Sequence, residues 1–91
     1  MIYVKVVWHH DVDEPTDPIE IWYEIKQDQW ALRGFEVFYD GKICKLHSMS
    51  LSVQIPTIEE LESIKYFDGY IISKQEFEEM WEKAIECELG Y

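Results

Sequence analysis

The sequence predicts an α+β domain: an antiparallel sheet of four or five strands, with a short helix and a C-terminal helix packed on one face. Three observations support this prediction. Apolar and polar residues alternate with period two in several segments. The pair Asp40-Gly41 separates two such segments. An apolar stripe with helical spacing occupies the C-terminal segment, and strands followed by helices are typical of α+β domains.

The composition indicates one folded domain over residues 1–91. Hydrophobic residues make up 47% of the chain and aromatic residues 15%. Disordered acidic segments lack this apolar material, which is needed to build a core. The length suits a single domain.

The first two strands are predicted over residues 2–9 and 19–26. In the first, one face carries Ile2, Val4, Val6 and Trp8. In the second, the expected core face carries Ile19, Ile21, Tyr23 and Ile25, and the expected polar face carries Glu20, Trp22, Glu24 and Lys26. Between these strands, two prolines and four carboxylates predict an exposed loop.

The Asp40-Gly41 pair predicts a two-residue type I′ hairpin, because both turn positions need a positive φ. In that register Val37 faces Cys44 and Phe35 faces Leu46, which places Cys44 in the core. A further alternating segment, residues 48–55, predicts another strand, and Pro56 ends it.

Two capping boxes predict two helices. Thr57 with Glu60 indicates a short helix over residues 58–64. Residues 65–72 are expected to be irregular, with Asp68-Gly69 as a turn.

The second capping box, Ser73 with Glu76, begins a helix expected over residues 74–88, with Gly90 as its C-terminal cap. Its core-facing stripe consists of Phe77, Met80, Trp81, Ala84 and Ile85.

The two cysteines, Cys44 and Cys87, are interpreted as buried free thiols, which suits a reducing cytoplasm; one disulfide is the alternative. The alternation at residues 1–5 is unlike a signal peptide, and no apolar run approaches the roughly 18 residues of a membrane span. We therefore expect a cytoplasmic protein that does not enter a membrane.

The charge indicates the class of partner. Nineteen acidic residues against eight basic ones give a formal net charge of −11. A domain of this size must carry a dense acidic field on some face, which repels nucleic acid and anionic membranes and attracts basic proteins.

Little in the sequence points to catalysis. The only cluster that resembles a metal site is His9-His10-Asp11-x-Asp13-Glu14, but adjacent histidines on a strand point in opposite directions. We predict no catalytic residue, no metal ligand and no cofactor. A metal-dependent enzyme that uses His10 and nearby carboxylates is kept as the third hypothesis.

The candidate partner-binding residues come from acidic segments and from two tryptophans. Trp22 has two interpretations: a second layer covers it, or it is an exposed aromatic anchor ringed by acids, as in protein-binding hot spots. The face of Trp30 is ambiguous. The full set is Asp11, Asp13, Glu14, Asp17, Trp22, Trp30, Glu78, Glu79, Glu82 and Glu86.

The ordered set of motifs resembles a family of short, poorly characterised bacterial α+β domains. The motifs are Trp8 with His10-Asp11, Pro18-Ile19-Glu20-Ile21, Arg33-x-x-Glu36-x-Phe38-x-Asp40-Gly41, Pro56, and Ile72-Ser73-x-x-Glu76-Phe77-x-x-x-Trp81. The resemblance implies the fold. In size and charge such domains look like immunity proteins of toxin–immunity systems.

Together these observations lead us to expect a non-catalytic acidic binding protein that neutralises a basic toxin, foremost a nuclease. An adaptor or regulatory module that binds another basic protein is the alternative.

Overall fold

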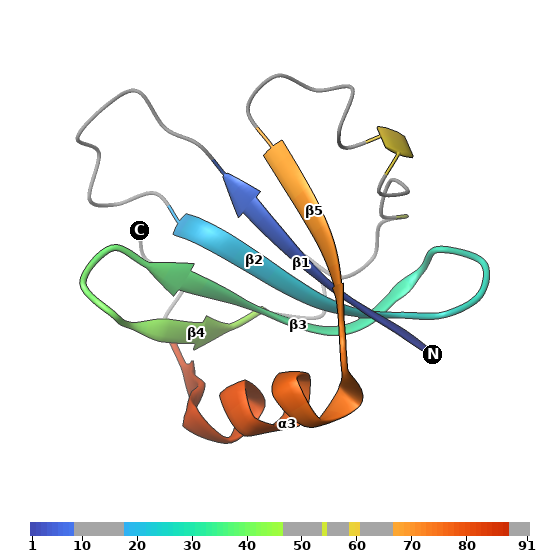
Figure 1. Cartoon of the computed structure of the whole chain (residues 1–91). Coiled ribbons are helices and arrows are strands. Elements are labelled where there is room, and N and C mark those ends of the chain that lie inside the picture. Colours follow the sequence, from blue (N-terminus) through green and yellow to red (C-terminus); the bar gives the residue numbers. More distant parts are fainter. Residues whose placement is uncertain (9–17, 47–53, 55–58, 61–66, 88–91) are drawn as a thin grey trace.

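The computed structural model describes residues 1–8, 18–46, 54, 59–60 and 67–87 (Figure 1). Within these residues, most of the regular structure consists of one sheet and one helix, α3. The elements are β1 (Ile2–Trp8), β2 (Pro18–Ile25), β3 (Ala31–Phe38), β4 (Ile43–Lys45), β5 (Phe67–Ile72), α3 (Lys74–Lys83) and β6 (Ile85–Glu86).

The sheet has the strand order β5-β1-β2-β3-β4-β6. Neighbouring strands are antiparallel except β4 and β6, which are parallel. The α+β class is confirmed. The prediction of four or five strands in a purely antiparallel sheet is wrong, because β5 and β6 extend its two edges and β6 runs parallel to its neighbour.

Both faces of the sheet bury apolar side chains. Helix α3 packs under one face (Figure 1), where the core consists of Tyr3, Trp22, Phe35, Phe77 and Ala84. The opposite face buries Val4, Val6, Ile25 and Ala31. The predicted polar face of β2 is therefore wrong for two of its residues, since Trp22 and Glu24 lie in the layer that α3 covers.

Helix α3 begins where the capping box predicts. The Ser73 hydroxyl accepts a hydrogen bond from the Glu76 backbone N–H at 3.1 Å, and a Glu76 carboxylate oxygen accepts one from the Ser73 N–H at 3.4 Å. The predicted end at residue 88 is wrong. Ala84 is extended, with φ −73° and ψ 141°, and the chain continues into β6. Ile85, assigned to the core stripe, is consequently 53% exposed, and Gly90 lies outside the described residues.

The β3–β4 hairpin forms at Asp40-Gly41, but its loop has three residues. The Gly41 N–H donates to the Phe38 carbonyl, and the Phe38 N–H donates to the Lys42 carbonyl. Gly41 has φ +89°, whereas Asp40 is not in the left-handed region. This is a type I turn followed by a left-handed glycine, so the predicted type I′ register is wrong by one residue.

The shift changes which residues face each other. Val37 pairs with Ile43, Phe35 with Lys45, and Cys44 with Glu36. Cys44 is buried as predicted, but it lies on the sheet face opposite to the one that α3 covers.

The segment expected to be irregular contains strand β5. Asp68 and Gly69 do not form a turn; they pair with Val7 and Val6 of β1. Of the predicted short helix, only Glu59 and Glu60 are described, and both are helical. Of the predicted strand over residues 48–55, only Gln54 is described, and it forms a bridge with Trp30. Pro56 and Thr57 lie outside the described residues.

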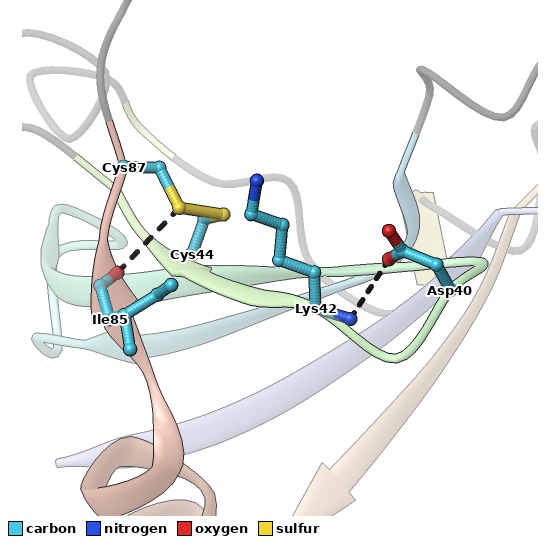
Figure 2. Close-up of a disulfide and its surroundings, with 5 residues drawn as sticks. All are labelled: Asp40, Lys42, Cys44, Ile85 and Cys87. Atoms are coloured by element: carbon cyan, nitrogen blue, oxygen red, sulfur yellow. Dashed lines mark hydrogen bonds between the residues drawn. A yellow bond between two sulfur atoms is a disulfide. The ribbon is translucent and has the colours of Figure 1, made fainter.

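The two cysteines form a disulfide, Cys44–Cys87, with 5.5 Å between their Cα atoms (Figure 2). The prediction of two free thiols is wrong. The disulfide forms because α3 ends early. The extended chain after Ala84 runs beside β4 and brings Cys87 next to Cys44. In the described part of the chain, no helix has the length and apolar character to cross a membrane.

Gly34 of β3 lies in close contact with neighbouring atoms, and Gly34→Ala is expected to lower the free energy of unfolding by about 1–3 kcal/mol. An added Cβ would lie 2.9 Å from the Trp22 carbonyl oxygen and 2.9 Å from Leu46 Cδ1. Urea denaturation measures the loss. Adding Leu46→Ala should recover only part of it, because the backbone contact remains. An unchanged midpoint for Gly34→Ala would contradict this packing.

Candidate binding surface

A charged network lies between the sheet and α3. Arg33 of β3 donates from Nε and Nη2 to the two oxygens of Glu24, at 2.9 and 2.8 Å. The Tyr3 hydroxyl donates to Glu24 Oε2 at 2.9 Å. Arg33 Nη2 also donates to Glu78 Oε1 of α3. The network thus ties three strands and the helix together.

The network holds Glu24 in its ionised form. Hydrogen bonds from Arg33 lower the pKa of Glu24, and they outweigh the opposing effect of burial. The same bonds raise the pKa of Arg33. Burial, followed by the hydrogen bond to Glu24, raises the pKa of Tyr3, so its hydroxyl keeps the proton that it donates. These contacts favour an ionised Glu24, a charged Arg33 and a protonated Tyr3 hydroxyl.

The Arg33 guanidinium also stacks on aromatic rings of α3. Its Cζ lies 5.1 Å from the ring centroid of Phe77 and 5.0 Å from that of Trp81. Lys45 Nζ lies 4.6 Å from the Trp81 ring centroid. These cations hold the inner side of α3 against the sheet. Glu78, a predicted partner-binding residue, is therefore engaged within the chain.

Three other predicted residues lie on α3 and β6. Glu79, Glu82 and Glu86 are exposed, and we call them the helix acidic surface. Among the described residues they form no ion pair. Glu79 accepts a hydrogen bond from Gln75 at 3.3 Å. This surface has the chemistry to bind a basic group.

Trp22 is buried, with 7% of its surface exposed, so its assignment as a partner-binding anchor is wrong. The alternative interpretation, that it is covered, is confirmed. Its ring stacks on Phe35 with centroids 5.3 Å apart, and its Nε1 donates to Glu20 Oε1 at 2.8 Å. Lys5 Nζ lies 5.5 Å from the ring centroid.

Trp30 is 41% exposed. It follows the turn between β2 and β3, in which the Trp30 N–H donates to the Asp28 carboxylate at 3.3 Å. Glu79 and Glu82 belong to α3, and Glu86 belongs to β6. The structure therefore places Trp30 on a different element from the helix acidic surface.

The remaining predicted residues, Asp11, Asp13, Glu14 and Asp17, lie outside the described residues, as does the His9-His10 pair. Among the residues that the structure describes, no group of three or more His, Cys, Asp or Glu side chains could hold a metal ion.

Burial raises the pKa of the Glu36 carboxyl group, which lies on β3 opposite Cys44.

The Tyr3–Glu24–Arg33 network was not predicted from the sequence. The sequence nevertheless contains a pattern that indicates this network. Glu24 and Arg33 flank the polar turn at residues 26–30, and pairing of the two strands places them opposite each other. Opposite charges at paired positions of one hairpin favour a cross-strand ion pair.

Comparison with known proteins gives a family and no activity. No curated protein and no solved structure matches the chain. One family model matches most of its length, which agrees with the expected membership of a poorly characterised domain family. Since that match covers residues 2–86, the chain belongs to the family described as Domain of unknown function (DUF6881).

Proposed function

We propose that this chain is a non-catalytic acidic binding protein that neutralises a basic toxin, as the immunity protein of a bacterial toxin–immunity pair. The observation that carries the proposal is the helix acidic surface, Glu79, Glu82 and Glu86, exposed on a chain with a net charge of −11. A nuclease is the favoured target, because its phosphate-binding site is basic and an acidic surface can occupy it.

The way α3 is held supports this role. A capping box fixes its start, Phe77 anchors its inner side, and Arg33 binds Glu78. A surface that is already ordered loses little conformational freedom on binding, so more of the interaction energy appears as affinity. Trp30 stays a candidate contact at a second place.

We place the chain in the cytoplasm in this proposal. The Cys44–Cys87 disulfide removes one of the reasons given for that compartment, because disulfides persist mainly in oxidising surroundings. The alternative, an adaptor that binds another basic protein, uses the same surface and differs only in the partner's own activity. A metal-dependent enzyme that uses His10 and nearby carboxylates is the third hypothesis, and metal analysis of the purified protein tests it.

The identifying experiment is purification of the chain from its native cells, followed by mass spectrometry of what remains bound. We expect a basic protein whose nuclease activity falls to background at a one-to-one ratio with this chain. A basic partner without toxic activity would favour the adaptor. Recovery of an acidic partner, or binding insensitive to salt, would refute the electrostatic mechanism.

Glu82→Lys is expected to slow association with that partner by about three- to tenfold at low salt, because it removes attraction during encounter. Stopped-flow association kinetics measure the effect. The matched control is Glu59→Lys, which makes the same charge change at another exposed helical position. Equal slowing by both variants would mean that overall charge, not the helix acidic surface, guides binding.

A further inference from the structure

The attachment of β6 to the sheet depends on one covalent bond. Strand β6 has two residues, and its two pairs, Cys44 with Ile85 and Lys45 with Glu86, join it to β4. Both Ile85 and Glu86 are exposed, so they bury little apolar surface. Within the described residues, the disulfide is the strongest link between residues 85–87 and the sheet.

The two sulfurs differ in their surroundings. Cys44 lies on β4 and is 6% exposed, whereas Cys87 follows β6 at the edge of the sheet and is only partly buried (Figure 2). Cys87 Sγ lies 4.0 Å from the Ile85 carbonyl oxygen of its own segment. An attacking thiolate must approach along the S–S axis, so the more exposed sulfur is the one it reaches.

We propose that the Cys44–Cys87 disulfide is a thiol-exchange site, which a small thiol opens by attack on Cys87 Sγ, releasing residues 85–87 from β4. The attacking thiolate forms a mixed disulfide with Cys87. The electron pair of the broken S–S bond goes to Cys44 Sγ, which takes a proton from water.

A second thiol completes the reduction. Its thiolate attacks the outer sulfur of the mixed disulfide and displaces Cys87, which is protonated in turn. Two thiol molecules are oxidised to one disulfide, and the protein gains two electrons and two protons. The released segment leaves the outer edge of β4 unpaired, while the contacts of Phe77 and Arg33 hold α3 in place.

The chemical test uses glutathione as the probe on the full chain without denaturant. After partial reduction, iodoacetamide blocks free thiols and peptides are mapped by mass spectrometry. We expect glutathione on Cys87 and the alkyl group on Cys44. Glutathione found on Cys44 alone, or a disulfide that resists reduction until denaturant is added, would overturn the proposal.

The structural test is hydrogen exchange of the oxidised and reduced chains. Reduction should remove protection from residues 85–87 and from the amides of β4 that point toward β6, leave β1, β2 and β3 protected, and be reversed by reoxidation. The double variant Cys44→Ser/Cys87→Ser should show the hydrogen exchange of the reduced chain, and glutathione should not change it. Loss of protection throughout β1–β3, or no change at all, would refute local release. Since no partner takes part, the outcome is independent of the proposed toxin binding.

Discussion

Phe77→Ala is expected to lower the free energy of unfolding by about 3–5 kcal/mol. Phe77 has no exposed surface and is the one buried residue of α3. Its ring centroid lies 5.2 Å from that of Tyr3 and 5.3 Å from that of Phe35. Removing the ring leaves a cavity between helix and sheet, and the surrounding rings cannot collapse fully into it.

Urea denaturation followed by tryptophan fluorescence measures this loss. Typical domains have about 5–15 kcal/mol of stability, so the variant should unfold at a much lower urea concentration. The control is Gln75→Ala, an exposed change in the same helix, which should alter stability by less than about 0.5 kcal/mol. A loss below about 1 kcal/mol for Phe77→Ala would mean that α3 is not packed on the sheet as described.

The start of α3 could be predicted from the sequence, but its end could not. The Ser73–Glu76 capping box and the position of Phe77 depend on residues within one helical turn of each other. The end depends on pairing between β6 and β4, and on a disulfide that spans 43 residues. The helical periodicity of the sequence continues past Lys83, and nothing in that segment indicates that the chain will pair with β4.

The β-structure shows the same division between local and distant causes. The alternation in β1 and β2 predicted both strands, since each is a local pattern. Asp40-Gly41 fits either a two-residue or a three-residue hairpin, so the register could not be chosen. Asp68-Gly69 is typical of a turn, but both residues pair with the edge of β1 and belong to β5.

The acidic character of the candidate surface follows from composition, whereas the roles of individual residues do not. Glu78 and Glu79 are adjacent in the sequence, yet one pairs with Arg33 and the other faces solvent. Trp22 has polar neighbours along its strand, which suggested exposure. It is buried because α3 covers part of the face that the alternation marks as polar.

Arg33→Met is expected to cost about 3 kcal/mol of stability at neutral pH. The value is at the low end for breaking a buried ion pair, because the Arg33 side chain is 29% exposed. Methionine keeps an apolar chain over the rings of Phe77 and Trp81. It leaves the carboxylate of Glu24, whose side chain is only 11% exposed, without its main partner. Adding Glu24→Gln removes that uncompensated charge and should recover part of the loss.

The pH dependence separates lost charge pairing from lost packing. The pKa of Glu24 is lowered in the folded protein, so its contribution to stability is present above the ordinary value of 4.5 and disappears as the pH falls through the folded pKa. The difference in unfolding free energy between wild type and Arg33→Met should therefore be largest near pH 7 and shrink below about pH 4.5. Urea midpoints at several pH values measure it. A difference that stays constant across this range would assign the effect of Arg33 to its packing on α3, since packing does not titrate.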